Sequence, residues 1–258
     1  LLYSSHIQVY SLQGQRPKRF ARFSLDGIPD SQTPSRDPVG NLLVADFNRD
    51  GRAEIFFRLF NKRHGLILAW NGSQLRELRQ LKSVPLCAFQ RGRRPTLIWG
   101  MPKPGMNSYQ AEVELSDINS SKGRAHRLPS GFSSLRCWQD SAGGPNHILA
   151  VDESSTLFVL ESDFSSRKVL DAVGVGVAPI DLDLDKEPEW VVSDAVWPGA
   201  SDSVRVLRGG QTVWRSLDVI GGVVAIAGGS RAASAKPVAV LATVESGSDN
   251  SRVYLLGR

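Results

Sequence analysis

A strand–turn–strand pattern that recurs at a near-constant interval is the feature that most restricts the folds open to this chain. Five copies come into register at Asp46, Ala88, Trp138, Asp181 and Ile226, with successive spacings of 42, 50, 43 and 45 residues. In each copy an apolar run leads through a turn into a second apolar run. A period of roughly 40–50 residues is typical of the four-stranded blades of a β-propeller.

The rest of each period supplies two further strands. In the first of the five copies, the apolar run Gly65–Trp70 is followed by Asn71-Gly72 and by the more polar run Gln74–Leu81. Asn-Gly between two such runs is a strong signal of a tight hairpin. Helical periodicity is nearly absent from the chain. The sequence therefore predicts an all-β fold, a β-propeller built from four-stranded antiparallel blades.

The predicted blades belong to one domain that spans the whole chain. We expect a partial N-terminal blade and five near-complete blades here, and about six or seven blades in the full protein. Because both ends of the chain supply a third strand, they do not combine into one blade, and we expect the chain to be cut from a longer protein. The approximate ranges are 1–26 for the partial blade and 40–82, 84–128, 133–172, 176–218 and 222–258 for the other five, within a single domain of residues 1–258.

The turn between the first two strands of the first copy is acidic. Three short oxygen-bearing side chains alternate at Asp46, Asn48 and Asp50, and a carboxylate follows at Glu54. Calcium prefers roughly six to eight oxygen ligands, which short side chains in a tight loop can supply together with the peptide carbonyl of Arg52. This loop therefore predicts a calcium site.

A second acidic turn repeats the design. It keeps the four side-chain oxygen positions, at Asp181, Asp183, Asp185 and Glu189. It differs from the first loop at the sixth position, where Lys186 takes the place of Gly51. We therefore expect the second turn to cost more or to differ in shape, because glycine alone adopts sharp turns without strain.

Neither loop has the features of an EF-hand. An EF-hand requires a bidentate Glu at the twelfth position and helices on both sides. Phe57 and Val192 stand at that position, and strands flank both loops. The EF-hand interpretation is excluded.

The segment Val44–Phe57 resembles the FG-GAP/VCBS repeat of integrin-type propellers, in which D-x-D-x-D-G-x-x-D/E precedes an apolar strand. The resemblance is specific at the first loop and good at the second, and elsewhere it is limited to period and strand pattern. It implies a propeller of roughly six to eight blades, with calcium in loops between strands, on an extracytoplasmic protein that binds other proteins or carbohydrate. The ligand sets that it implies are Asp46, Asn48, Asp50, Glu54 and the carbonyl of Arg52, and Asp181, Asp183, Asp185, Glu189 and the carbonyl of Glu187.

The alternative for both loops is an Asx-type turn without metal, in which the carboxylates bond the amides of their own loop. In either case the role is structural. A calcium ion with a full set of protein ligands has no open position for a substrate, so it ties two strands together.

Catalytic motifs are absent from the sequence. No nucleophile elbow, Walker loop or dinucleotide fingerprint is present, and the paired carboxylates belong to the two acidic loops. The histidines are isolated, at His6, His64, His126 and His147. We predict that the chain is not an enzyme, with a hydrolase or lyase accessory domain as a remote alternative.

Composition restricts the partners. The net charge is +5 and the pI about 9.4, but the basic residues are scattered and not interleaved with aromatic ones, so we expect no nucleic acid. No apolar stretch reaches the roughly 18 residues of a membrane-spanning helix, so we expect no transmembrane segment.

Cys87 and Cys137 occupy matching positions in the first strands of two neighbouring blades. We expect free buried thiols there, with a disulfide as the alternative.

Together these features predict a calcium-stabilised binding or scaffold module that mediates protein–protein interaction. We expect it outside the cytoplasm (in the periplasm, at the cell surface or secreted), where Ca²⁺ is abundant enough to fill weak sites. The alternative is a carbohydrate-binding, lectin-like propeller. Trp197 is the best candidate for an exposed sugar contact, because most of the other tryptophans lie inside strands.

Overall fold

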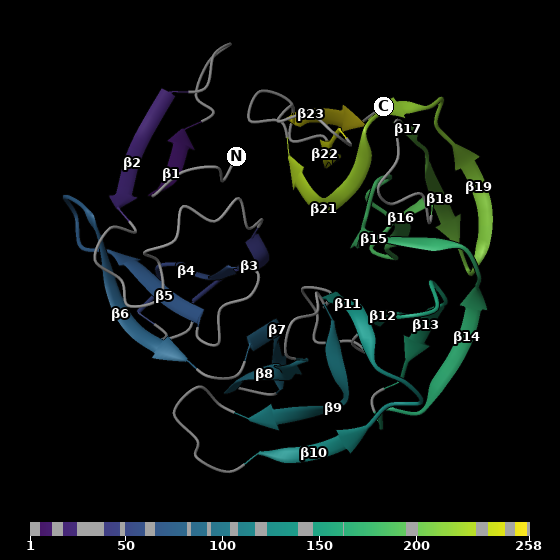
Figure 1. Ribbon diagram of the computed structural model, residues 1–258, viewed down its shortest axis with the longest axis horizontal. Helices are drawn as coiled ribbons and strands as arrows, with labels where there is room; N and C mark the ends of the chain where they lie inside the picture. Colours follow the sequence, from purple (N-terminus) through teal and green to yellow (C-terminus); the bar gives the residue numbers. More distant parts are fainter. Residues whose placement is uncertain are drawn as a thin grey trace. The chain divides into compact units, whose positions relative to one another are not determined.

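The structure, a computed structural model, describes the chain in fourteen stretches that contain only β-strands, turns and bends (Figure 1). Within them, no helix has the length and apolar character needed to cross a membrane. The strands of each sheet whose pairing is resolved run antiparallel, which confirms the prediction of an all-β, antiparallel fold. The described residues are 6–11, 18–24, 39–46, 50–59, 65–81, 84–91, 94–103, 108–116, 123–138, 147–161, 163–194, 201–230, 237–245 and 251–256.

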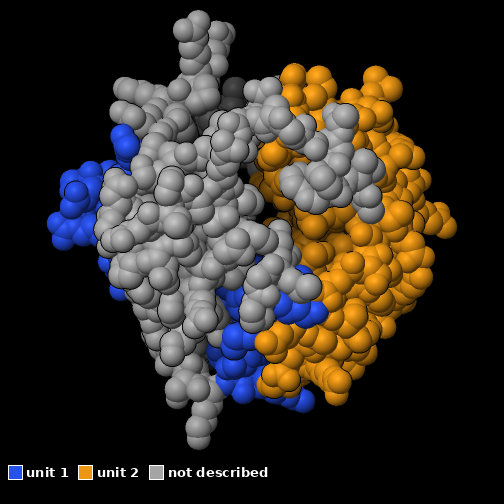
Figure 2. All heavy atoms as spheres, viewed as in Figure 1, with its two compact units in different colours: residues 1–88, 95–109, 113–124 blue, residues 89–94, 110–112, 125–258 orange. Residues whose placement is uncertain are grey.

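The chain divides into two compact units, and the first comprises residues 1–88, 95–109 and 113–124 (Figure 2, blue). It begins with the hairpin of β1 and β2. A four-stranded sheet follows in the order β3-β4-β5-β6. The bounds are β1 His6–Ser11, β2 Lys18–Ser24, β3 Val39–Ala45, β4 Glu54–Leu59, β5 Gly65–Trp70 and β6 Leu75–Leu81. Strand β2 lies near β6, and a small apolar core forms around Leu66, Leu68 and Leu75.

The next eight strands are hydrogen-bonded in the order β14-β13-β12-β11-β9-β8-β7, with β10 paired to β9. Their bounds are β7 Val84–Arg91, β8 Arg94–Pro102, β9 Tyr109–Ser116, β10 Arg124–Arg127, β11 Phe132–Trp138, β12 His147–Asp152, β13 Leu157–Leu160 and β14 Ser166–Leu170.

The second unit comprises residues 89–94, 110–112 and 125–258 (Figure 2, orange). After β11–β14 it contains a four-stranded sheet, β15-β16-β18-β19, the short pair β17-β20, and a three-stranded sheet, β21-β22-β23. The bounds are β15 Val173–Ile180, β16 Glu189–Asp194, β17 Ser201–Asp202, β18 Val204–Arg208, β19 Gln211–Arg215, β20 Val219–Ile220, β21 Gly222–Ser230, β22 Pro237–Val244 and β23 Ser251–Leu256.

Within this second unit, the β15-β16-β18-β19 sheet is packed on both faces. Its first strand, β15, contacts β11 as well as β21. Successive side chains of a strand point to opposite faces, so Trp190 and Val192 of β16 join a core with β12 and β13, whereas Val191 joins a core with β21 and β22. Full burial of each such side chain stabilises the fold by roughly 1.5–3 kcal/mol. The sheets of this unit are therefore stacked face to face with their first strands adjacent.

Both cysteines of the chain, Cys87 and Cys137, are disulfide-bonded. The prediction of free thiols was wrong. A disulfide forms only where two Cα atoms lie within about 7 Å of each other. A separation of 50 residues in the sequence does not reveal that proximity.

Candidate functional site

The first acidic loop connects β3 to β4 and is folded around its own carboxylates. The amide of Gly51 donates to Asp46 Oδ2 at 3.0 Å, and the amide of Arg52 donates to Asp50 Oδ1 at 2.8 Å. Glu54, the first residue of β4, is buried at 1% exposure. Asp46, Asp50 and Glu54 each offer a carboxylate oxygen within 4.8 Å of the others.

The second acidic loop connects β15 to β16 and has the same internal bonds. The amide of Lys186 donates to Asp181 Oδ2 at 3.1 Å, and the amide of Glu187 donates to Asp185 Oδ1 at 2.8 Å. These repeat the i+5 and i+2 bonds of the first loop. At the end of the loop Glu189 Oε2 accepts from the amide of Leu182 at 2.9 Å, so the two strands are tied together at their junction with the loop.

The backbone at the two matching turn positions is also the same. Gly51 has a φ of 83° and Lys186 a φ of 77°. The lysine thus adopts the left-handed conformation that glycine adopts in the first loop, so the two turns match at this position. The expected cost remains, because a side chain in this conformation clashes with the following carbonyl oxygen, at roughly 1–2 kcal/mol.

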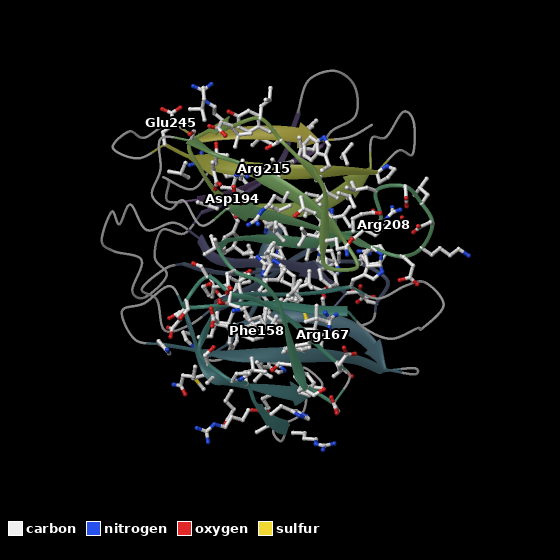
Figure 3. All side chains as sticks on the ribbon, turned by 90° about the vertical axis from the view of Figure 1, so that its right-hand side faces the viewer. Phe158, Arg167, Asp194, Arg208, Arg215 and Glu245 are labelled. Carbon is white, nitrogen blue, oxygen red and sulfur yellow. The ribbon has the colours of Figure 1, made fainter. Side chains whose placement is uncertain are left out.

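A cation that the sequence analysis missed completes the second loop. Arg208 lies at the end of β18 (Figure 3). It makes ion pairs with Asp183 and Glu189. Its Nε also donates to Glu189 Oε1 at 3.1 Å. Glu189 is 3% exposed, and a buried carboxylate requires a compensating charge or several hydrogen bonds. Arg208 supplies the charge.

The electrostatic effect is mutual. The carboxylates of Glu189 and Asp183 raise the pKa of the Arg208 guanidinium above its usual value. The hydrogen bond from Arg208 in turn lowers the pKa of Asp183. The pair follows from strand register: β16 pairs with β18 through Trp190↔Leu207, and one further step of this register places Glu189 opposite Arg208.

The two loops bring together part of each predicted ligand set. The second loop gathers carboxylate oxygens of Asp181, Asp183 and Asp185 within 4.8 Å, as the first does with its three. Asn48 lies outside the described residues. The short oxygen donors and the loop geometry fit a hard cation such as Ca²⁺, and the amide bonds fit the Asx-type alternative equally well.

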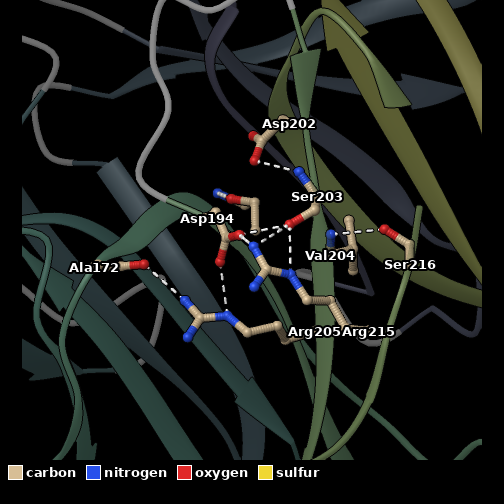
Figure 4. Close-up of polar contacts among 10 residues, drawn as sticks. Ala172, Asp194, Asp202, Ser203, Val204, Arg205, Arg215 and Ser216 are labelled. Atoms are coloured by element: carbon tan, nitrogen blue, oxygen red, sulfur yellow. Dashed lines mark hydrogen bonds and ion pairs between the residues drawn. The ribbon is translucent and has the colours of Figure 1, made fainter. Parts of the chain in front are cut away.

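A second polar cluster lies at the other end of β18, and sequence reasoning did not predict it (Figure 4). Asp194 forms ion pairs with Arg205, at 2.7 Å, and with Arg215. It also accepts a hydrogen bond from the hydroxyl of Ser203, which accepts from Arg215 Nε at 3.1 Å. These contacts join β16, β18 and β19, which is a structural role.

Asp202 is buried beside this cluster. Its carboxylate accepts from the amides of Ser203, at 2.7 Å, and of Val223, at 2.9 Å. Burial raises the pKa of Asp202 despite these bonds. The side chain connects β17 to the start of β21, so it also holds the fold together.

The tryptophans are divided between core and surface. Trp99 and Trp190 are buried, and Trp214 of β19 is 45% exposed. Trp197, predicted to be an exposed contact, lies outside the described residues.

Of the histidines, His126 has a described side chain, which stacks on Phe164 with ring centroids 4.3 Å apart.

Comparison with solved structures shows what fold these elements compose. The chain is similar to a crystal structure of BBS1N in complex with ARL6DN, soaked with lead, with a TM-score of 0.57 and 11% identity over 99% of this chain and 74% of that one. A second structure of the same complex, soaked with mercury, gives a TM-score of 0.50 and 11% identity over 83% and 76%. These neighbours are β-propellers. The likeness shows a propeller fold.

Comparisons based on sequence do not assign the chain to a family. No protein-family model matches the chain, and no curated protein matches it by sequence. The number of blades, their closure and the FG-GAP/VCBS assignment therefore stay predictions.

Proposed function

We propose that this chain is a non-enzymatic propeller that binds a protein partner. The observation that carries the proposal is the fold match over 99% of the chain to BBS1N, a propeller crystallised in complex with the protein ARL6DN. Propellers present loops and sheet edges on a rigid scaffold, which is well suited to binding other proteins. The sequence contains no catalytic motif that would favour chemistry over binding.

The first acidic loop is the calcium site of this scaffold. Asp46, Asp50 and Glu54 converge there, and a cation bound among them would offset the mutual repulsion of the three carboxylates. The ion would tie β3 to β4, with Asn48 and the carbonyl of Arg52 as the remaining protein ligands. It would stabilise the scaffold without taking part in a reaction.

The second loop shares the ligand pattern but has an internal cation. Arg208 neutralises Asp183 and Glu189, two of the five residues that the resemblance assigns to calcium. The second loop is therefore stabilised chiefly by Arg208, and calcium adds less there than at the first loop.

An extracytoplasmic location agrees with the disulfide-bonded state of the cysteines and with the calcium site proposed above. Disulfides persist in oxidising compartments, and both cysteines of this chain are disulfide-bonded. Calcium at the concentrations found outside cells also fills weaker sites that the cytosol leaves empty.

Carbohydrate binding is the second candidate. The observation that favours it is Trp214, whose indole is 45% exposed on β19 and could stack on a sugar ring. A glycan array probed with the wild-type chain and with Trp214→Ala tests it, and only binding that the substitution removes supports this candidate.

The main proposal is tested with the purified chain. It is immobilised, proteins retained from the envelope or secreted fraction of the source organism are identified, and each candidate is purified and titrated against the free chain by calorimetry. A purified protein that binds with a dissociation constant of about micromolar or tighter supports the proposal. If no purified candidate binds, the protein-binding function is wrong.

A further inference from the structure

A cavity of about 440 Å³ opens within the second unit, between the β16-β18-β19 strands and the β22-β23 strands. Its walls are mostly apolar, and among the residues that form them are Leu182, Val191, Val206, Trp214, Ala239 and Leu256. Apolar cavities of roughly 150 Å³ already accept benzene. This one has room for a larger ring.

The cavity has a clear origin in the sequence. Trp190 of β16 pairs with Leu207 of the next strand, and Ala239 of β22 pairs with Leu256 of the next strand. Trp190 belongs to the core that β16 forms with the preceding sheet, and Ala239 belongs to the core that β22 forms with its own preceding sheet. Ala239 and Trp190 thus face the preceding sheet from matching strands, and the second core has a small alanine near the end of the strand at which the first core has an indole.

The walls also include apolar side chains that are unusually exposed. Val213 and Trp214 of β19 and Leu255 of β23 are among the exposed large hydrophobic residues of the described chain, and all three contribute to the cavity. Clustered exposed apolar groups mark interaction surfaces more often than isolated ones do. The mouth of the cavity is therefore apolar.

One wall is charged and predominantly acidic. Asp183, Glu189 and Arg208 contribute to it, and their formal charges sum to −1. The adjoining loop adds the exposed or half-buried side chains of Asp181, Asp185, Lys186 and Glu187, which bring the sum to −3. A ligand that places positive charge beside this wall gains favourable electrostatic interaction.

We propose that this cavity is the anchor pocket for a protein partner, and that it accepts an aromatic side chain flanked by lysine or arginine. The proposal rests on the protein-binding function and names the partner's recognition element. Buried aromatic anchors dominate the binding energy of protein interfaces. The indole of Trp190 shows which kind of group fills the equivalent space in the neighbouring core, and the acidic wall selects the flanking charge.

Indole is the first probe. It is titrated into the wild-type chain while the methyl resonances of Val206, Val213 and Leu255 are followed by NMR, and we expect saturable shifts at all three. Ala239→Trp supplies the missing indole from within the chain and should abolish these shifts. Ala225→Trp, which adds the same group at an exposed position of β21, should leave them in place.

The second probe is a library of random peptides displayed on phage and selected on the wild-type chain. We expect the enriched peptides to carry an aromatic residue next to Lys or Arg and to bind Ala239→Trp about tenfold more weakly or worse. Because Ala239→Trp could perturb folding, Leu255→Glu provides an independent test at a half-exposed wall position. Val253→Glu is its matched control, since Val253 lies on the same strand, is also exposed, and does not line the cavity.

The outcomes separate this inference from the proposed function. Loss of peptide binding in Leu255→Glu but not in Val253→Glu supports the anchor pocket. Peptides or a native partner that bind all variants equally would overturn the pocket while leaving the protein-binding function intact. Absence of both indole and peptide binding overturns the pocket, and glycan binding that depends on these residues replaces it with a carbohydrate site.

Discussion

The two acidic loops share a left-handed residue, at Gly51 and Lys186, and a matching pair of amide bonds. They differ in the residue on the next strand that faces the buried glutamate. In the second loop that position is Arg208. In the first loop the register Ile55↔Leu68, continued by one residue, places Ala69 opposite Glu54. The second loop thus has a guanidinium paired with Asp183 and Glu189, and the first loop has an alanine at the matching position. We propose that the residue on the third strand that faces the buried glutamate, and not the loop geometry alone, sets how strongly each loop depends on calcium.

The sharpest test of this difference, with the largest expected effect, is calcium dependence in two single variants. Calcium at about 100 times its dissociation constant should stabilise the wild-type chain by about 2.7 kcal/mol, measured as a rise in melting temperature. Asp46→Ala should lose most of that rise, whereas Asp181→Ala should keep it although its baseline is lower. Equal losses in the two variants would show that Arg208 does not stand in for an ion.

Removing the internal cation should make the second loop behave like the first. Arg208→Ala leaves Glu189 buried without its ion-pair partner and should lower the free energy of unfolding. The loss should be smaller than for a fully buried pair, because Arg208 is itself half exposed. Chemical denaturation without calcium measures the loss. Added calcium should then stabilise this variant more than it stabilises the wild type. Arg252→Ala, which breaks the exposed pair with Glu245 at 3.1 Å, should cost about 0–1 kcal/mol.

The reciprocal substitution is the control. Ala69→Arg places a guanidinium at the matching position of the first loop, so the calcium-dependent rise in melting temperature should shrink. If calcium stabilises Ala69→Arg as much as the wild type, the facing residue does not govern the metal requirement.

A smaller effect concerns the shared turn. Gly51→Ala places a side chain at a φ of 83° and should destabilise the chain by about 1 kcal/mol. Lys186→Gly relieves the same strain in the second loop and should stabilise it by about 0.5–1 kcal/mol, because the strain relieved exceeds the entropy that glycine adds to the unfolded chain. Paired urea titrations measure both. The two substitutions should change the free energy of unfolding in opposite directions. A change in the same direction would mean that the two turns are not equivalent.

The smallest effect is a pH dependence confined to the second loop. Arg208 lowers the pKa of Asp183, so the stability from this pair is present above the unfolded pKa of about 3.9 and is lost as pH falls through the lower folded value. In Arg208→Ala the carboxyl carbon of Asp183 should titrate at higher pH by NMR. The raised pKa of Asp202 arises mainly from burial and should not move, so a common shift of both groups would contradict this assignment.

The repeat period predicted the strands well because each sheet is assembled from neighbours in sequence. The predicted run Gly65–Trp70 coincides with β5, and the predicted run Gln74–Leu81 overlaps β6, Leu75–Leu81. Short β17 and β20 were missed, since a two-residue pair leaves no alternation in the sequence. Three-dimensional proximity was harder to foresee, and the disulfide-bonded state of the cysteines is the clearest example.

The candidate site was predicted only in part for the same reason. Asp46 and Asp181 accept hydrogen bonds from amides only a few residues further along the chain, so a local motif revealed both loops. Arg208 follows Glu189 by 19 residues, and its partnership depends on strand register, which a motif does not contain. The cavity lies beside Ala239, which faces the preceding sheet from the strand that matches the strand of Trp190. This difference in side-chain size becomes visible only when the two cores are compared.

The placement of Arg208 in the same sheet as its loop has an evolutionary consequence. The acidic residues, the turn and the facing residue of each loop all lie within a single repeat, so one duplicated copy can exchange an ion for a side chain without any compensating change in its neighbours. Repeats that contact one another only through apolar faces tolerate such independent divergence. With calcium in the first loop, as proposed, a propeller of this kind can lose its dependence on the ion one repeat at a time.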